Sequence, residues 1–408
     1  MSQSILTYSS LYPSNAQPQH GVFVENRLRR IVTLGGVDAR VVAPVPWFPF
    51  AGKRLGRYGA YAGISPAESR YGIPIDHPRY PVIPKIGMSI APWLMYRATR
   101  AMMTQLRDDA IGFDVIDAHY FYPDGVAAAM LGQTLGRPVV ISARGTDVNL
   151  ISNFAAPRRQ FLQAAEFAHA IIAVSDALRR RMIDIGIAAE KIIVLRNGVD
   201  AALFAPLDRQ RVRRDLGITR QTMVAVGNVL ESKGQDIAIR SLTHLDDTEL
   251  LIVGTGSDEK KFAGLAESLG VANRVRFVGR VPHEELARYF NAADVSVLAS
   301  MREGWPNVLL ESLACGTPVV ASNVGGVPEI ITTPNVGRIM KKRTPEALAD
   351  AVRDLRSQQP DRTAIRFFAE GFGWEETARA QAALYAEVAA AATPPVGSPA
   401  TRRSYTGA

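Results

Sequence analysis

Short apolar runs alternate with amphipathic stretches along most of this 408-residue chain. The runs have the length of buried strands, whereas the stretches repeat apolar residues at helical spacing, as Val24, Leu28 and Ile31 do. Strand–helix alternation of this kind is typical of parallel sheets that are covered by helices. The pattern therefore predicts an α/β fold.

The alternation falls into two sets. The first has predicted strands at 5–10, 39–44, 114–119, 138–145, 171–175 and 192–200, with helices at 23–34, 93–109, 125–135 and 157–170. The second has strands at 222–229, 249–256, 275–280, 295–300 and 317–322, with helices from about 234, at 257–269, at 283–291 and from 306. Residues 44–92 hold nine prolines and are predicted to be irregular, not regular sheet.

The length of the chain favours two domains, because it exceeds what one hydrophobic core usually supports. The alternation breaks at NGVDAALFAPLD, which places an N-terminal domain at 1–200 and a C-terminal domain at 201–373. A last strong helix is predicted at 374–392, and the Pro-, Ser-, Gly- and Arg-rich tail at 393–408 is predicted to be disordered. Two doubly wound domains that face each other have a ligand crevice at the carboxyl ends of their sheets.

Composition excludes several classes of protein. With 47% hydrophobic and 21% charged residues, the chain is typical of a soluble globular enzyme. A single cysteine, Cys315, excludes an internal disulfide and a cysteine metal cluster. The N-terminus lacks the features of a signal peptide, and no apolar run approaches the roughly 18 residues of a transmembrane helix. We therefore expect a cytoplasmic protein.

The net charge of +8 is concentrated in residues 51–107, which have a net charge of +7. Nine basic residues lie there, interleaved with six aromatic ones: Lys53, Arg54, Arg57, Arg70, Arg79, Lys85, Arg97, Arg100 and Arg107, with Tyr58, Tyr61, Tyr71, Tyr80, Trp93 and Tyr96. Such a segment suits an anionic membrane surface or a polyanionic substrate, and a solvated basic face is an equal alternative. No nucleic-acid-binding motif accompanies the charge, so nucleic acid is not an expected partner.

The segment EGWPNVLLESLACG at 303–316 places two carboxylates around a predicted helix start. Proline is favoured at the first helical position, so the helix is predicted to begin at Pro306, with unpaired N–H groups that suit an anion. Asn307 and Glu311 share one face of that helix, and Glu303 precedes it. Two carboxylates there suit vicinal hydroxyl groups, although Glu311 paired with an arginine or bound to a backbone group is an equal alternative.

Lys233, in GNVLESKGQDIAI, stands at another predicted helix N-terminus, where the helix dipole disfavours a cation. An ordinary solvated lysine is one alternative. A bound phosphate reverses the dipole argument, because lysine, backbone N–H groups and dipole then all attract one anion. Two such sites on adjacent strand–helix units indicate a diphosphate. The chain has no P-loop, and GTGSDE at 254–259 matches a dinucleotide motif only in part. No DxD pair or histidine cluster offers a metal site.

Polar residues also end two predicted N-terminal strands. His119 ends 114–119, and Arg144 and Asp147 follow 138–145, so all three are candidates for the crevice. Asp147 could orient His119 or an acceptor hydroxyl, although a lone histidine is more often structural than catalytic. Gly21, before the first helix, permits close approach of the backbone to a ligand, and it fits a simple turn equally well.

Taken together, these segments resemble the family 4 retaining glycosyltransferases of the GT-B fold. Glu303 and Glu311 match the E-x7-E motif of that family, and the resemblance extends to VGNVLESKG, IVGTGSDEKKF, VRFVGRVPHEEL, HYFYPDG and RGTD. It spans residues 1–390. The N-terminal YPSNAQPQHGVFVENRLRRI is similar to members that build cell-envelope polysaccharides, such as teichuronic-acid-type transferases.

The resemblance implies a role for each matching residue. Glu311 binds the ribose and Glu303 the sugar of a nucleotide-sugar donor, and Lys233 with Gly304, Trp305, Pro306, Asn307 and Val308 holds its diphosphate. His119 lies near the transferred sugar, Gly21 near the phosphates, and the base packs around Gly254 and Val281. Arg144 and Asp147 remain candidates for the acceptor side. Many members have Gly-Arg where this chain has Gly227-Asn228, so Lys233 or Arg280 is expected to supply the missing charge.

The resemblance further implies two Rossmann-like domains, a C-terminal helix that crosses back to the N-terminal domain, and sugar transfer with retention and without a metal or other cofactor. The expected substrates are a nucleotide sugar and a glycan or lipid-linked acceptor, in bacterial cell-surface polysaccharide synthesis. Two alternatives are an epimerase of the same fold and a non-catalytic protein that binds sugar nucleotides.

Overall fold

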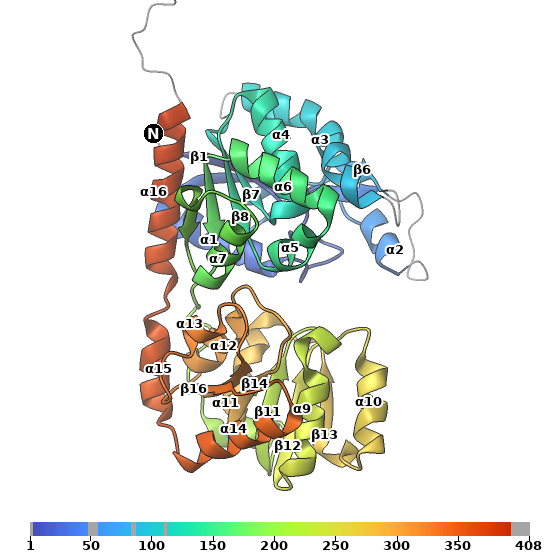
Figure 1. Ribbon diagram of the computed structural model, residues 1–408, viewed down its shortest axis with the longest axis vertical. Helices are drawn as coiled ribbons and strands as arrows, with labels where there is room; N and C mark the ends of the chain where they lie inside the picture. The colour runs from blue at the N-terminus through green and yellow to red at the C-terminus, as the bar shows by residue number, and fades with distance from the viewer. Residues whose placement is uncertain (1–2, 48–55, 83–86, 110–111, 393–408) are drawn as a thin grey trace, which may run out of the picture.

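The computed structural model describes residues 3–47, 56–82, 87–109 and 112–392 of the chain. It has two α/β domains, one above the other in Figure 1, and each domain is built on its own sheet. The predicted α/β fold with two parallel sheets is confirmed.

The N-terminal sheet has the strand order β10-β9-β8-β7-β1-β2-β5-β4, and only β4 is antiparallel to its neighbour. Its strands are β1 (Ser4–Tyr8), β2 (Asp38–Val42), β4 (Ala67–Arg70), β5 (Ile73–Asp76), β7 (Val115–His119), β8 (Val139–Ala143), β9 (Ala170–Ala173) and β10 (Ile192–Val194). The helices are α1 (Val22–Gly35), α2 (Gly56–Ala62), α3 (Ala91–Asp108), α4 (Val126–Leu135), α5 (Thr146–Asn149), α6 (Ala155–Phe167) and α7 (Asp176–Asp184). Strands β7, β8 and β9 are buried along their whole length, as expected where helices cover both faces.

The C-terminal sheet is entirely parallel, in the doubly wound order β13-β12-β11-β14-β15-β16. Its strands are β11 (Gln221–Val226), β12 (Thr248–Val253), β13 (Val275–Gly279), β14 (Val295–Leu298), β15 (Val319–Ser322) and β16 (Gly337–Met340). The helices are α8 (Arg209–Asp215), α9 (Gln235–Ser241), α10 (Glu259–Ser268), α11 (Leu286–Ala292), α12 (Asn307–Ala314), α13 (Val327–Ile330), α14 (Pro345–Ser357) and α15 (Arg362–Glu370). The predicted boundary at residue 200 falls between the two sheets.

The last helix, α16 (Trp374–Ala392), leaves the C-terminal domain and runs along the side of the N-terminal domain (Figure 1). Leu384, Tyr385 and Val388 pack there in one apolar cluster with residues of α1 and β1. Inside this contact, the buried Arg27 donates a hydrogen bond to Gln381, with a distance of 2.7 Å between Nε and Oε1. The C-terminal helix therefore belongs to the core of the N-terminal domain.

The prediction that residues 44–92 lack regular sheet is wrong for the part that the structure describes. Strands β4 and β5 form a hairpin that extends the main sheet beyond β2, and β3 (Val45–Trp47) pairs with β6 (Arg79–Pro81). These strands tolerate proline because they are short and lie at or near sheet edges. Pro74, for example, precedes the residues of β5 that pair with β2.

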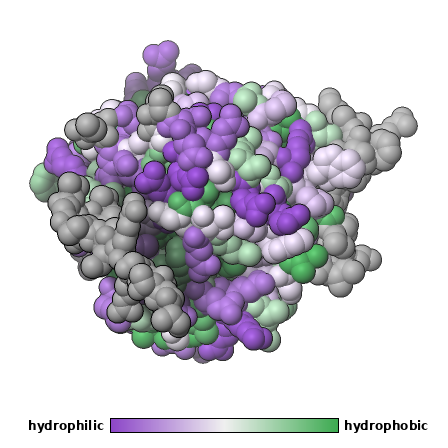
Figure 2. Space-filling model, turned by 90° about the horizontal axis from the view of Figure 1, so that it is seen from above, coloured by the Kyte–Doolittle hydropathy of each residue, from purple (hydrophilic) through white to green (hydrophobic). Residues whose placement is uncertain are grey.

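The basic segment 51–107 is only in part a free surface. Arg70 pairs with the buried Glu25 at 2.5 Å, and Arg79 donates to backbone carbonyls. Lys53, Arg54, Lys85 and the tail 393–408 lie outside the described residues, as do the side chains of Arg57 and Tyr58. Seen from the N-terminal end of the molecule, small hydrophobic patches are scattered among hydrophilic side chains (Figure 2).

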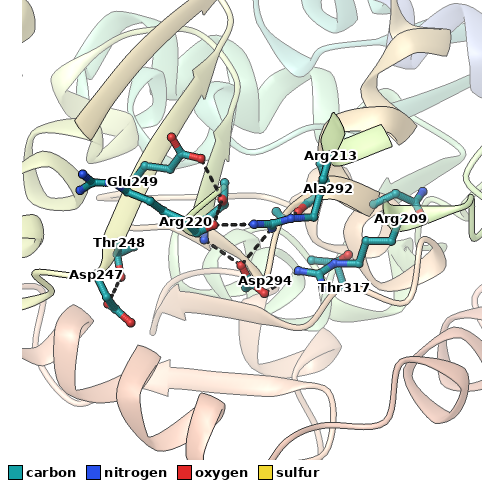
Figure 3. Close-up of polar contacts among 12 residues, drawn as sticks. Arg209, Arg213, Arg220, Asp247, Thr248, Glu249, Ala292, Asp294 and Thr317 are labelled. Carbon is teal, nitrogen blue, oxygen red and sulfur yellow. Dashed lines mark hydrogen bonds and ion pairs between the residues drawn. The ribbon is translucent and has the colours of Figure 1, made fainter. Parts of the chain in front are cut away.

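A polar cluster around Asp294 supports the C-terminal sheet at the amino ends of β11 and β14 (Figure 3). The Asp294 carboxylate accepts hydrogen bonds from Arg209 at 2.5 Å, from the backbone N–H of Thr222 at 2.7 Å and from Arg213 at 3.4 Å. Arg213 also donates to the carbonyl of Ala292, the last residue of α11. One carboxylate thus joins two arginines to the start of the central strand β11.

Candidate active site

Two neighbouring cavities lie between the domains at the carboxyl ends of the sheets. We call the larger one, of about 510 Å³, the central cavity; Arg144 and Asn197 of the N-terminal domain line it, as do Asn228, Lys233 and residues 302–305 of the C-terminal domain. The hinge-side cavity, of about 310 Å³, is lined among others by residues 198–200, His283 and Glu311. Phe23 and Asn307 line both cavities, so the two form one continuous crevice.

Glu303 and Lys233 meet in the central cavity. Glu303 Oε1 accepts hydrogen bonds from Lys233 Nζ at 2.8 Å and from Ser300 Oγ at 2.6 Å. Lys233 lies in the turn before α9, and its side chain is one-third exposed. The Lys233 ammonium is therefore already paired with the largely buried Glu303 carboxylate. A phosphate in this cavity would compete with Glu303 for the lysine.

Glu311 lies on the inner face of α12 and is 9% exposed. Its partner is His283, whose Nε2 is 3.1 Å from Glu311 Oε1. Within the described residues it pairs with neither an arginine nor a backbone group, which were the two alternatives considered for it. Burial opposes a charge on His283, but the hydrogen bond and the negative charge of Glu311 raise the pKa of the imidazole above its ordinary value. His283 was not predicted as a site residue, although it follows Val281 by only two positions.

The loop before α12 packs against the N-terminal domain backbone to backbone. A Cβ on Gly304 would lie 2.2 Å from the carbonyl oxygen of Arg144, so only glycine fits there. The buried Trp305 donates from Nε1 to the carbonyl of Asn197 at 2.9 Å. Pro306 precedes α12, which begins at Asn307, one residue later than predicted. The N-terminus of α12, which belongs to the C-terminal domain, is therefore also held by contacts with the N-terminal domain.

His119 ends β7 as predicted, but it is fully buried and does not line either cavity. Its Nε2 is 2.6 Å from Asp117 Oδ2, and Arg144 donates to Nδ1. This arrangement fits the neutral tautomer with the proton on Nε2, and burial lowers the pKa of His119 to about 4. Arg144, which donates to His119, lines the central cavity, so one side chain separates His119 from that cavity, and its place near the transferred sugar stays a prediction.

Asp147 is also fully buried. Its carboxylate accepts hydrogen bonds from the backbone N–H groups of Phe121 at 2.7 Å, Gly145 at 2.8 Å and Val148 at 3.1 Å, besides that of Arg144. The structure therefore gives Asp147 the role of holding the loop after β8, whereas the predicted acceptor-side position would require an accessible carboxylate.

Of the two residues expected to supply the charge of a family arginine, Lys233 lines the central cavity and Arg280 does not. Asn228 also lines this cavity, and the guanidinium of Arg280 lies 3.5 Å from Thr255 Oγ1. Arg302 lines the cavity and makes no hydrogen bond with the described residues. Its position beside Glu303 in the sequence was a usable signal that the prediction did not include.

The remaining predicted residues have structural contacts at the edges of the crevice. A Cβ on Gly21 would lie 2.2 Å from the carbonyl oxygen of Leu11, and one on Gly254 would lie 2.0 Å from that of Gly227. The carbonyl of Val281 accepts a hydrogen bond from Gln19 of the N-terminal domain at 3.3 Å. Val308 is half-buried and packs against the core.

Comparison with known proteins identifies the family of this chain. Residues 208–370 match the model of the glycosyl transferases group 1, and residues 36–203 match the model of glycosyltransferase family 4. The chain belongs to these glycosyltransferases. It is 31% identical over 303 residues, 67% of its length, to a D-inositol 3-phosphate glycosyltransferase of Catenulispora acidiphila, and these residues cover 72% of that protein.

Another relative among the glycosyltransferases is similar over more of the chain. TuaC of Bacillus subtilis, by its name a teichuronic acid biosynthesis glycosyltransferase, is 28% identical over 367 residues, which cover 87% of this chain and 90% of TuaC. Solved structures share the fold: sucrose-phosphate synthase of Thermosynechococcus elongatus has a TM-score of 0.76 at 18% identity and 96% coverage of this chain and 100% of that one. Anabaena HepE in complex with UDP-glucose has a TM-score of 0.72 at 21% identity, with 95% and 100% coverage. The predicted GT-B fold is confirmed.

The His283–Glu311 pair makes a pH-dependent prediction for this glycosyltransferase. The pKa of His283 is raised in the folded state, so the pair stabilises the protein fully below the ordinary histidine value of about 6.5 and less as the pH rises through the higher folded value. As the pH rises through this window, we expect the free energy of unfolding of the protein without nucleotide to fall by less than about 1 kcal/mol. The affinity for nucleotide is expected to rise, because neutral His283 holds Glu311 less tightly. Melting and nucleotide titrations between pH 6 and 9 measure both effects. A pH profile that is unchanged in His283→Gln would contradict the assignment.

Glu329, from α13, makes a second contact between the domains. It accepts hydrogen bonds from the backbone N–H groups of Asp176 and Ala177 at the start of α7, both at 3.0 Å, and from Arg196 at 2.6 Å. Burial opposes its charge, but these donors lower the pKa of Glu329 below its ordinary value. The C-terminal domain thus supplies the N-terminal cap of a helix in the other domain.

Glu329→Gln is expected to leave nucleotide affinity unchanged within about twofold and to lower kcat about tenfold, because it removes a contact between the domains from a residue that lines neither cavity. Kinetics together with the radius of gyration in solution test this. Glu370→Gln, which removes an exposed ion pair with Arg366 on α15, is the matched control. A normal kcat with an unchanged radius would show that Glu329 has no part in closure.

Proposed function

We propose that this protein transfers a sugar from a nucleotide-diphosphate sugar to a glycan or lipid-linked acceptor, with retention of anomeric configuration, in the synthesis of a cell-surface polysaccharide. The observation that carries the proposal is the arrangement of Glu303, Lys233 and Glu311 around the N-terminus of α12 within one crevice. Membership of the glycosyltransferase family and the name of the relative TuaC support it.

Each of these residues has a defined part in the proposed reaction. Glu311 accepts hydrogen bonds from the ribose hydroxyls once His283 releases it, and Glu303 accepts them from the sugar. Lys233, Arg302 and the N–H groups at the start of α12 stabilise the diphosphate. The bond between the anomeric carbon and the phosphate oxygen breaks with its electron pair on that oxygen, the acceptor oxygen bonds to the carbon, and its proton is released. Stabilisation of the leaving phosphate is therefore the main contribution of the protein.

No metal has a part in this proposal. Among the described residues, no three His, Cys, Asp or Glu side chains are grouped as metal ligands, and the metal-free reaction stays a prediction. Two other functions predict different products. An epimerase would release an isomerised sugar nucleotide without an acceptor, and a binding protein would leave every donor intact.

A donor screen tests the proposal. Melting temperature and release of nucleotide are measured with UDP-, GDP-, ADP- and dTDP-sugars for the wild type, Glu311→Ala and Lys233→Ala. The expected result is one nucleotide sugar that stabilises the wild type and neither variant. If no sugar nucleotide shifts the melting temperature of the folded wild type, the proposed function is wrong.

We also propose that α3 and the turn before it contact an anionic membrane surface. Met88, Ile90 and Trp93 are exposed large apolar side chains there, and the guanidinium of Arg97 lies 5.5 Å from the ring centroid of Trp93. None of the described helices is long and apolar enough to cross a bilayer. Exposed aromatic and aliphatic tips beside a basic group suit binding at the surface, where cations attract acidic lipids.

Sedimentation with vesicles of phosphatidylglycerol and phosphatidylcholine tests this contact. Binding is expected to increase with the phosphatidylglycerol fraction, to weaken with salt, and to fall severalfold in Trp93→Ala/Arg97→Ala. Phe367→Ala, which removes an exposed aromatic side chain of the C-terminal domain, is the control. Equal sedimentation of both variants and the wild type would exclude α3 as the contact.

A further inference from the structure

A third cavity, of about 160 Å³, lies inside the N-terminal domain at the carboxyl ends of β1 and β2. We call it the β1–α1 cavity, because the loop between β1 and α1 (residues 9–21) forms one of its walls. The other walls come from the segment after β2, from the residues around the end of α2, and from β6 with the turn before it. In Figure 1, α2 lies at the edge of the N-terminal domain that is nearer the C-terminal domain.

The β1–α1 loop separates this cavity from the hinge-side cavity. Pro18 and Gln19 line the hinge-side cavity, and Gln17 and His20 line the β1–α1 cavity. Gln19 also reaches the C-terminal domain, where its Nε2 donates to the carbonyl of Val281. The β1–α1 cavity is therefore one loop away from the place where Glu311 would hold a nucleotide.

Tyrosines and small polar groups line the β1–α1 cavity. Tyr12, Tyr61 and Tyr80 contribute rings, and among the described lining residues there is no Lys, Arg, Asp or Glu. Tyr80 is 7% exposed, and its hydroxyl makes no hydrogen bond within the described part of the chain. A buried hydroxyl normally has a partner, so this group is available to a ligand in the cavity. Ser14 Oγ accepts from the N–H of Gln17 at 3.2 Å, which leaves its own O–H free to donate.

The walls of the cavity are held in place by Arg79, which lies outside it, and by His77, which lines it. Arg79 donates to the carbonyls of Tyr61 at 2.5 Å and Ile64 at 2.7 Å, and so fixes the segment after α2. Both ring nitrogens of His77 are engaged, with Glu68 at 2.9 Å and with the carbonyl of Ala43 at 3.2 Å. A preformed pocket with few polar groups that converge on it is the usual form of a small-molecule site.

We propose that the β1–α1 cavity binds one uncharged sugar unit of the acceptor. This inference rests on the proposed glycosyl transfer, and it adds the class of acceptor. The cavity volume of about 160 Å³ corresponds to about five water molecules at roughly 30 Å³ each, which is the size of a single pyranose ring. Tyrosine rings pack against the C–H faces of a sugar, and the Tyr80 and Ser14 hydroxyls bond to its hydroxyl groups. Because the described lining has no cation, a uronate or a phosphorylated sugar binds less well.

Saturation-transfer NMR on the full-length protein tests the site, with methyl α-D-glucopyranoside and methyl N-acetyl-β-D-glucosaminide as probes and methyl glucuronide as the charged comparison. We expect the binding curves of the neutral probes to reach saturation, and we expect the glucuronide to bind more weakly. Tyr80→Phe is expected to raise the Kd of the neutral probes about fivefold, the loss of one hydrogen bond of about 1 kcal/mol. Ser14→Ala is expected to do the same.

Tyr96→Phe is the matched control, since the Tyr96 hydroxyl bonds to Thr134 on the outer surface of α3 and α4. Nucleotide-sugar binding is measured on the same samples by thermal shift and is expected to be equal in all variants. Failure of the proposed saccharide site can therefore be distinguished from failure of the proposed glycosyl transfer. The inference is wrong if the nucleotide sugar binds but no neutral glycoside shows saturable binding. It is also wrong if the nucleotide sugar binds and Tyr80→Phe and Ser14→Ala bind the neutral glycosides with the wild-type Kd. If glycosides bind in a Tyr80-dependent way but no nucleotide sugar does, the proposed function is wrong and the saccharide site remains.

Discussion

Glu303→Gln is expected to lower the rate of sugar transfer about 100-fold or more while the protein remains folded. In the structure Glu303 Oε1 accepts hydrogen bonds from Lys233 and Ser300, and no described residue donates to Oε2. In the proposed reaction the carboxylate accepts hydrogen bonds from the hydroxyls of the donor sugar, and its negative charge faces the cationic character that develops at the anomeric carbon. Preorganised charges of this kind contribute about 100- to 1,000-fold each in a water-excluded site.

The change is expected mainly in kcat, because glutamine keeps the shape of the side chain and one acceptor oxygen. Lys233→Ala should instead raise the Kd for the donor, since it removes the cation that we propose binds the diphosphate. Single-turnover kinetics together with nucleotide titrations separate the two effects. Glu285→Gln, which affects only an exposed pair with Arg288, is the control. If Glu303→Gln transfers sugar at the wild-type rate, Glu303 is a structural partner of Lys233 and the proposed role is wrong.

The pairing of Glu303 with Lys233 also predicts that the two variants are not additive. Each single change leaves a buried or half-buried charge without its partner, whereas the double variant removes both charges. The donor affinity lost in Glu303→Gln/Lys233→Ala is therefore expected to be less than the two single losses combined, as is usual for side chains in contact.

The periodic elements were predictable from the sequence because they depend on local pattern. Runs such as VVISA at 139–143 are apolar at every position, as only a strand covered on both faces needs to be, and the structure buries all five residues. The start of α12 was likewise predictable to within one residue, because Gly-Trp-Pro ends the preceding loop and Pro306 cannot lie further inside a helix. The position of the crevice followed from the strand–helix alternation, because two doubly wound domains bind ligands at the carboxyl ends of their strands.

The hairpin β4–β5 and the pair β3–β6 were not predictable in the same way. Their strands have three or four residues each, and β3, β5 and β6 contain proline. Strand β5 pairs with β2, and β3 pairs with β6, which are distant in the sequence. Hydrophobic periodicity has little meaning over so few positions, and pairing depends on tertiary contacts that a local pattern does not contain.

Strand ends show a second limit of prediction. His119 ends the buried strand β7, and Arg144 and Asp147 follow the buried strand β8, yet of these three residues only Arg144 lines the crevice. Gly145, with a φ of 125°, turns the chain so that Asp147 points back to the backbone N–H groups around it. The sequence places such residues at the edge but does not say whether the side chain points outward or beneath the loop. The partner of Glu311 was missed for the same reason, because His283 lies in an irregular turn.

Asp294→Asn is expected to be the most destabilising single change in the C-terminal domain outside the crevice, at about 3 kcal/mol. The side chain of Asp294 is 18% exposed, and it is the carboxylate that both Arg209 and Arg213 contact (Figure 3). Burial and the nearby Arg209 lower the pKa of Arg362 to about 10, and Asp294 opposes that effect. Removal of one negative charge would leave three arginines facing one another, and a buried ionic group that loses its partner typically costs 3–5 kcal/mol, or about 3 kcal/mol for these partly exposed arginines.

Hydrogen exchange of β11 and β14 is the measurement of choice for Asp294→Asn, because a two-domain protein need not unfold in one step. Faster exchange is expected in these two strands and not in β1 or β7 of the other domain. Asp350→Asn provides the matched control, since Asp350 pairs with Arg353 on the exposed face of α14, where an ion pair contributes about 0.5 kcal/mol or less. Equal exchange in the two variants would mean that the carbonyl contacts of the arginines, such as that of Arg213 with Ala292, already satisfy the cluster. In that case the hydrogen bond from Thr222 to Asp294, and not charge compensation, would be the contribution of this carboxylate.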